Sequence, residues 1–204
     1  MTEKDTYQTI RESSEGLYKE KGSRFISFAF PVENKEHAEK LISDLRKKYH
    51  DARHHCFAYI LNPDQSEYRI NDDGEPSNSA GQPILGQIKA HHLTNILVIV
   101  VRYFGGTLLG VGGLIRAYKT AAADAIDNAS IVTGTIREIY QLRYSYDLTN
   151  AVMKAVEAHG IKILDQQFND QVKLEIGIRK SFAERVIQKL HLLRGLEIKY
   201  IGTG

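Results

Sequence analysis

The sequence predicts an α+β fold divided between two domains. Segments with strand-like alternation are interleaved with segments whose apolar residues recur at helical spacing. The chain has 204 residues, more than the usual domain of about 100–150 residues. Both periodicities restart after Thr133-Gly134-Thr135. We therefore expect an N-terminal β-α domain over residues 1–136 and a C-terminal domain over residues 137–204.

The N-terminal half opens with an expected antiparallel hairpin, formed by residues 13–22 and the aromatic-rich residues 24–32. Asn34 is placed to cap a helix that ends near Tyr49. Strands are expected over residues 52–61 and 67–71, followed by a polar loop over 72–83 and a short helix over 84–90. A buried strand is expected over 95–104, and a glycine-dense connection over 105–113 leads to a helix from Leu114 to about Ala129.

The C-terminal half predicts a strand around residues 140–146, a helix over 150–159 and a strand over 161–168. A turn at Asn169-Asp170 leads to a strictly alternating strand over 172–178. The last helix is expected to begin at a capping box, Ser181-x-x-Glu184, and to end at Gly195 before a final strand over 196–200. This order, βαββαβ, is the ferredoxin-like arrangement.

Composition narrows the class of protein. The net charge is +2, from 27 basic and 25 acidic residues, so nucleic-acid binding would depend on a local patch. A single cysteine, Cys56, excludes an intrachain disulfide framework and favours the cytoplasm. The polar N-terminus predicts no secretory signal, and the longest apolar run, residues 96–101, is far short of the roughly 20 residues that span a bilayer. We expect no membrane partner.

One stretch resembles a known family. It contains Asp-Asp-Gly-Glu-Pro at residues 72–76, Ala-Gly-x-Pro-Ile-Leu at 80–85, and the run from Asn95 to Tyr118 with its many glycines and two arginines. This pattern is similar to that of the IMPACT/YigZ family, whose bacterial members have two domains. Ser77-Asn78-Ser79 departs from the Gly-Thr of many relatives.

The resemblance implies an N-terminal domain similar to a fold shared by a small-subunit ribosomal protein and domain IV of elongation factor G. It likewise implies a ferredoxin-like C-terminal domain similar to domain V of that factor. Eukaryotic relatives regulate translation by competing for the activator of a starvation-responsive kinase. For this chain the resemblance implies only a translation-linked role.

The glycine-dense connection predicts an anion site. Its glycines free the backbone to expose N–H groups near a helix start, and arginine can hold two oxygens of a phosphate. The alternative is that the glycines serve only tight packing and turns. The pattern matches neither a P-loop nor a strict dinucleotide fingerprint, so we expect neither an ATPase nor an NAD enzyme. The candidate anion or nucleic-acid-binding residues are Arg102, Gly105, Gly106, Gly112, Gly113, Arg116 and Lys119.

Asp72, Asp73 and Glu75 place three carboxylates within four residues. They either bind a hard cation such as Mg²⁺ or pair with Arg102 or Arg116 to hold the loop, and we favour the ion pairs. We therefore expect no metal and no cofactor. Strand alternation separates His55 from His54 and Cys56, which makes Cys56 a core residue rather than a nucleophile.

Together these features favour a non-enzymatic, translation-linked regulator that binds RNA, the ribosome or a translation factor. One alternative is an enzyme that acts on a small phosphorylated substrate and uses the same anion site, with an acid of the 72–75 loop as its acid, base or metal ligand. The other is a purely protein-binding module. No catalytic residue is assigned, and nothing in the sequence selects an oligomeric state.

Overall fold

The computed structural model describes residues 5–204 and divides into two compact units. One unit comprises residues 8–134, and the other combines Thr135–Gly204 with residues 5–7. Strands β1 (Thr6–Ile10) and β7 (Ile131–Thr135) form a two-stranded sheet, and both lie where the chain passes from one unit to the other. No helix within residues 5–204 combines the length and the apolar character needed to cross a lipid bilayer.

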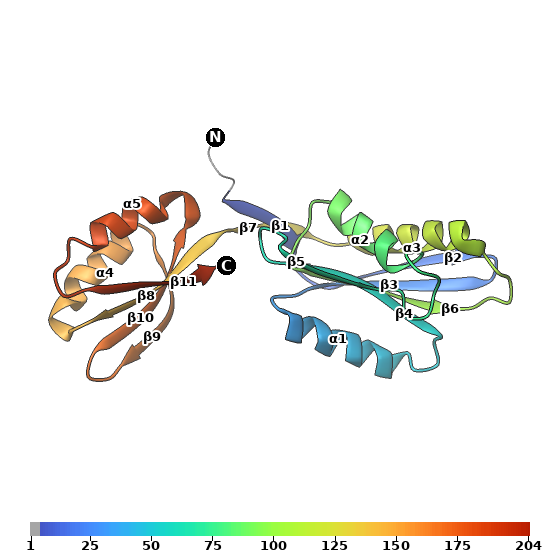
Figure 1. The fold of residues 1–204 in the computed structure, drawn as a ribbon, viewed down its shortest axis with the longest axis horizontal. Helices are drawn as coiled ribbons and strands as arrows, with labels where there is room; N and C mark the ends of the chain where they lie inside the picture. The colour runs from blue at the N-terminus through green and yellow to red at the C-terminus, as the bar shows by residue number, and fades with distance from the viewer. Residues whose placement is uncertain (1–4) are drawn as a thin grey trace. The chain divides into compact units, whose positions relative to one another are not determined.

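The N-terminal unit is built on a five-stranded sheet in which neighbouring strands are antiparallel. In spatial order the strands are β2 (Ser14–Glu20), β3 (Ser23–Pro31), β6 (Ile96–Tyr103), β4 (His54–Leu61) and β5 (Glu67–Asn71). Helix α1 (Lys35–Lys48) covers one face, and α2 (Gly81–Ala90) and α3 (Gly110–Asp127) cover the other (Figure 1). This arrangement explains why the central strands lack polar alternation: both of their faces are buried.

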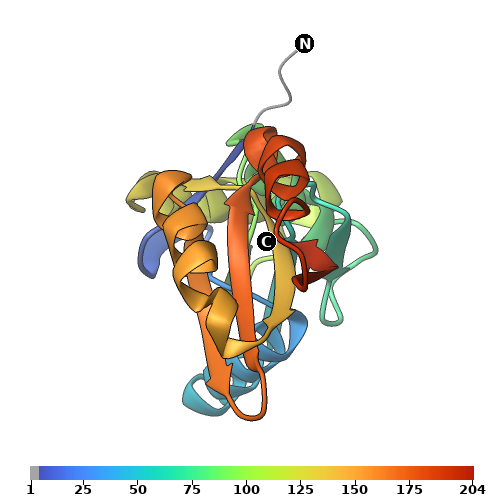
Figure 2. The same cartoon turned by 90° about the vertical axis from the view of Figure 1, so that its left-hand side faces the viewer.

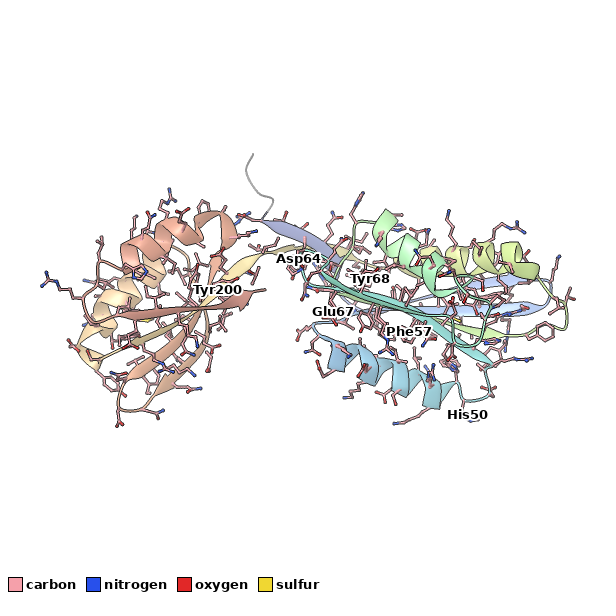
Figure 3. All side chains as sticks on the ribbon, in the orientation of Figure 1. His50, Phe57, Asp64, Glu67, Tyr68 and Tyr200 are labelled. Atoms are coloured by element: carbon pink, nitrogen blue, oxygen red, sulfur yellow. The ribbon has the colours of Figure 1, made fainter. Side chains whose placement is uncertain are left out.

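Each face of this sheet has its own core, because alternate side chains of a strand point to opposite faces. On the α1 face, Phe57 and Tyr59 of β4 pack with apolar residues of α1 (Figure 3). On the α2/α3 face, Cys56 and Ala58 of the same strand pack with the small residues of α3. Asn34 begins α1 as predicted: its Oδ1 accepts a hydrogen bond from the His37 amide at 2.8 Å.

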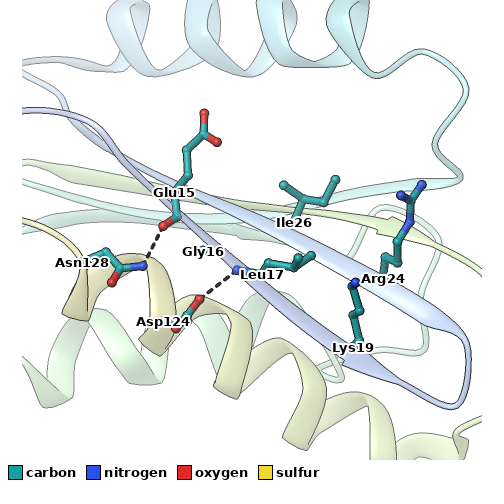
Figure 4. Close-up of a pocket in the computed structure, with 8 residues that line it drawn as sticks. All are labelled: Glu15, Gly16, Leu17, Lys19, Arg24, Ile26, Asp124 and Asn128. Atoms are coloured by element: carbon teal, nitrogen blue, oxygen red, sulfur yellow. Dashed lines mark hydrogen bonds between the residues drawn. The ribbon is translucent and has the colours of Figure 1, made fainter.

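The free edge of β2 is covered by side chains from α3 (Figure 4). The Leu17 amide donates to Asp124 Oδ2 at 2.8 Å, and Asn128 Nδ2 donates to the Glu15 carbonyl at 2.9 Å. Gly16 permits this approach, since a Cβ at this position would lie 2.6 Å from the Ala125 nitrogen. The edge is thereby protected from pairing with another strand. A shallow pocket of about 470 Å³ lies beside it.

The C-terminal unit has the ferredoxin-like topology. Its elements are β8 (Arg137–Tyr144), α4 (Thr149–Ala158), β9 (Lys162–Phe168), β10 (Val172–Arg179), α5 (Lys180–Leu190) and β11 (Glu197–Thr203), with a short 3₁₀ turn at Tyr146–Leu148. The antiparallel sheet runs β11-β8-β10-β9, and α4 and α5 lie on one face of it (Figure 2). Alternate residues of β10, beginning with Val172 and Leu174, fill the core beneath these helices.

Three helix starts differ from the sequence prediction. Helix α2 begins at Gly81, three residues before the predicted start at Ile84. Helix α3 begins at Gly110 rather than Leu114, so Gly112 and Gly113 lie inside its first turn and Arg116 in its second. Gly113 leaves room for the residue that precedes the helix, since a Cβ on Gly113 would lie only 3.0 Å from Leu109 Cβ.

Helix α5 does not use the predicted capping box. It begins at Lys180, and its Ser181 amide donates to Asp5 Oδ1 at 3.0 Å. The cap thus comes from the start of the chain, 176 residues away, which no local pattern indicates. This helix also ends at Leu190, before Gly195. Strand β1, which follows Asp5, was likewise not predicted.

Candidate functional site

A buried carboxylate, Glu75, organises the loop between β5 and α2. Its Oε1 accepts hydrogen bonds from Arg102 Nη1 at 2.6 Å and from the Tyr118 hydroxyl at 2.8 Å. His54 Nε2 lies 3.9 Å from the same oxygen. The partners come from β6, α3 and β4, so Glu75 ties the loop to three separate elements.

Arg102 is an unusual buried cation. Its side chain is 6% exposed, and its guanidinium lies 5.4 Å from the centre of the Phe25 ring and 5.7 Å from that of Phe104. Arg102 Nε is buried without a hydrogen-bond partner in the part of the chain that the structure describes. A buried polar group without a partner is uncommon and often marks the position of a ligand or water.

The other two acids of the loop have structural partners. Asp72 Oδ1 accepts hydrogen bonds from the Ala80 and Gly81 amides at 3.0 and 2.8 Å, which caps the start of α2. Asp73 accepts from the His55 amide at 2.7 Å and pairs with Arg46 at 2.5 Å. Residues 5–204 contain no group of three His, Cys, Asp or Glu side chains placed to hold a metal ion.

Cys56 lies beneath this network as a neutral thiol. It is fully buried, and its Sγ lies 3.0 Å from the Asp72 carbonyl oxygen and 3.3 Å from the Tyr118 hydroxyl, two acceptors for its one proton. Burial, reinforced by the nearby carboxylates, raises the pKa of the Cys56 thiol far above its usual range. Burial likewise raises the pKa of Tyr118. A thiol held protonated in this way is a poor nucleophile.

A pocket of about 220 Å³ opens beside Arg102. Glu75 and Arg102, only 4% and 6% exposed, are its most buried lining residues, whereas Leu108 is 83% exposed at its rim. The lining contains two arginines, Arg53 and Arg102, and one acid, Glu75, so the pocket has a positive balance. Its lining residues are Arg53, His54, Gly74, Glu75, Arg102, Phe104 and Leu108.

The glycines of the β6–α3 connection have different surroundings. Gly105 packs directly on the hairpin between β2 and β3: a Cβ there would lie 1.9 Å from the Gly22 carbonyl carbon. Gly106, with φ of +86°, and Gly112 both face open space. Leu109, the N-cap residue of α3, makes no side-chain hydrogen bond to the first amides of this helix.

Arg116 and Lys119, both predicted as binding residues, are exposed on α3 and do not line the pocket. Arg116 lies near Tyr18 of β2. Burial and the neighbouring Glu20 raise the pKa of the Tyr18 phenol, and the positive charge of Arg116 partly opposes that rise. The predicted residues that do line the pocket are Arg102 and Glu75.

Comparison with known proteins places this site within a described family. The model of the Impact N-terminal domain matches residues 21–126, which include every residue that lines the pocket. A Haemophilus influenzae protein named IMPACT family member is 33% identical over 83% of this chain and 84% of its own length. The chain belongs to the IMPACT family.

Other matches extend the likeness to both units. The Escherichia coli IMPACT family member YigZ is 32% identical over 78% of each chain. A domain of unknown function (DUF1949) matches residues 142–191. A solved structure described as that of a hypothetical protein is 29% identical and covers 97% of this chain and 98% of its own, with a TM-score of 0.76.

Sequence reasoning missed Arg53 and His54 as lining residues of this pocket. Alternation placed His54 and Cys56 on one face of their strand, but only the pairing of β4 with β6 sets His54 opposite Arg102. Arg53 precedes β4 with no motif around it.

Proposed function

We propose that this IMPACT-family chain is a non-enzymatic, translation-linked regulator in the cytoplasm, where it binds RNA, the ribosome or a translation factor. The binding site is the pocket beside Arg102 together with the glycine-rich start of α3. The observation that carries the proposal is the buried Arg102 guanidinium, whose Nε lacks a partner at the wall of a pocket that also contains Arg53.

The chemistry of the site suits an anion. Glu75 neutralises one positive charge of the pocket, and Arg53 and the uncapped start of α3 supply the rest. The overall charge of +2 would not hold a polyanion by itself, so such a local concentration of positive charge is required. The translation link is an inference from family membership.

The test is salt-dependent binding to ribosomes and to single-stranded RNA, measured for the intact chain and for Arg53→Ala and Arg116→Ala. If each arginine contacts a phosphate, each substitution lowers the affinity and reduces the slope of log affinity against log salt by about one. Lys40→Ala is the matched control, because Lys40 is exposed on α1, across the sheet from the pocket. Unchanged affinity and slope in both arginine variants would overturn the proposed site.

An apolar rim supports protein binding as the second candidate. Phe104, Leu108, Val111 and Ile115 are all exposed large apolar residues, from the end of β6 into the second turn of α3. If a protein partner binds mainly through these residues, its affinity changes little with salt concentration. The same affinity should fall in the Leu108→Ser variant. That result would favour the protein-binding module over the RNA-binding regulator.

A further inference from the structure

We propose that the pocket beside Arg102 holds a terminal phosphate monoester, from a mononucleotide or from the phosphorylated end of an RNA. The inference rests on the proposed function, since it names the part of an RNA that the same pocket takes. Three properties of the pocket carry it: its shape, its size and the hydrogen-bond donors in its lining.

The shape favours the end of a chain. The most deeply buried lining groups, Glu75 and Arg102, are 4% and 6% exposed, whereas Arg53 and Leu108 lie at the surface. An internal phosphodiester continues on both sides of the phosphorus and must stay outside such a pocket. A terminal monoester has one ester bond, so it enters with its three free oxygens first.

The size excludes larger ligands. Pockets for drug-sized ligands and cofactors commonly have volumes of about 300–1,000 Å³. The volume here, about 220 Å³, is smaller and suits a phosphate with part of its carrier. Phe104 and Leu108 at the rim offer apolar contact to a sugar or base that remains partly outside.

The available donors match a monoester. His54 Nδ1 lies 2.8 Å from the Asp73 carbonyl, so Nδ1 carries a proton and donates it to that oxygen. His54 Nε2 is 3.9 Å from Glu75 Oε1, too far for a hydrogen bond. The guanidinium groups of Arg53 and Arg102 therefore supply the donors, from two positions in the lining. A monoester carries a charge of about −1.5 to −2 at neutral pH and three acceptor oxygens, which such a set can share.

The experiment compares matched ligands by fluorescence anisotropy and calorimetry at low salt. The probes are a seven-nucleotide RNA with a 5′-phosphate, a 3′-phosphate or neither, and adenosine with and without its 5′-phosphate. We expect the 5′-phosphate or the 3′-phosphate to strengthen RNA binding by about tenfold or more, because it adds charge-assisted hydrogen bonds. Arg53→Ala should remove most of that preference, and Lys40→Ala should leave it intact.

The outcomes separate this inference from the proposed function. RNA that binds equally well with and without terminal phosphates overturns the inference but leaves RNA binding in place. Adenosine monophosphate that binds through Arg53, while neither RNA nor ribosomes bind, supports the pocket assignment and overturns the proposed function. A phosphoserine peptide that binds more tightly than any phosphorylated RNA overturns the assignment to nucleic acid.

Discussion

Arg102 Nη1 and Glu75 Oε1 are joined at 2.6 Å in a site where both side chains are almost fully buried. The pair links the central strand β6 to the loop before α2. Removing one member of a buried ion pair leaves the other charge without compensation, which is far more costly than the loss of an exposed pair.

We therefore expect Glu75→Gln to lower the free energy of unfolding by roughly 3–5 kcal/mol, measured by urea denaturation. Glu39→Gln is the control, because Glu39 is 48% exposed and pairs with Lys35 and Arg69 at the surface. Its expected cost is at most about 1 kcal/mol. Equal effects of the two substitutions would show that the buried pair is not a major stabilising contact.

Gly105, in the β6–α3 connection, and Gly112, in the first turn of α3, should respond oppositely to alanine. At Gly105 a new Cβ meets the backbone of Gly22 and Ser23 at 1.9–2.4 Å, so we expect Gly105→Ala to cost at least ~2 kcal/mol of stability. At Gly112 a Cβ meets nothing within 4 Å in the first turn of α3, so Gly112→Ala should be neutral or stabilise by up to about 1 kcal/mol. Thermal and urea unfolding of both variants measure the contrast.

Gly112→Ala also tests the backbone of α3 as a binding element. If a phosphate approaches the first amides of α3, the new methyl group obstructs it, and RNA affinity falls although stability does not. If instead affinity is unchanged, the glycine serves no close contact with a ligand at this position.

Cys56 is expected to resist thiol reagents in the folded protein. Its thiol is fully buried and its pKa is raised by burial, so little thiolate exists at pH 8. The rate of labelling by iodoacetamide should rise by orders of magnitude in denaturing urea. Cys56→Ala should cost at most about 1–2 kcal/mol and leave binding intact. Loss of all activity in a folded Cys56→Ala protein would revive a nucleophilic role.

Asp5 should make the C-terminal unit sensitive to acid. Hydrogen bonds from Ser181 and the neighbouring Arg179 guanidinium lower the pKa of the Asp5 carboxyl below its usual value. A carboxyl with a lowered pKa in the folded state contributes stability above its unfolded pKa, near 3.9, and loses it as pH falls through the folded value. We expect the stability advantage over Asp5→Asn at pH 7 to decrease as the pH falls below about 4 and to be lost once the folded carboxyl is protonated. A constant advantage from pH 7 to pH 2.5 would contradict this.

Residues 137–204 should fold without the N-terminal unit. They contain all four strands and both α-helices of the ferredoxin-like sheet, with a core of their own. Cooperative urea unfolding of this fragment is the expected result, at lower stability than in the whole chain because the Asp5 cap is missing. A broad, non-cooperative transition would contradict the proposed boundary.

The sequence by itself determined the class of fold and most of its elements. Period-two and helical patterns are local, so β10, the buried strand β6 and the Asn34 cap of α1 could be predicted from neighbouring residues alone. The family followed from the glycines and arginines between Asp72 and Tyr118, whose spacing is also a property of the linear chain.

Only the tertiary structure decided which of those residues meet. Asp5 caps a helix 176 residues away, and the pairing of β4 with β6 sets His54 opposite Arg102. Glu75, 27 residues from Arg102, reaches it because Asp72 and Asp73 fix the loop to α2 and β4. Such contacts depend on strand register and helix packing over the whole unit. Local periodicity carries no information about either, so the sequence predicted an anion site on α3 and the structure added Arg53 and His54.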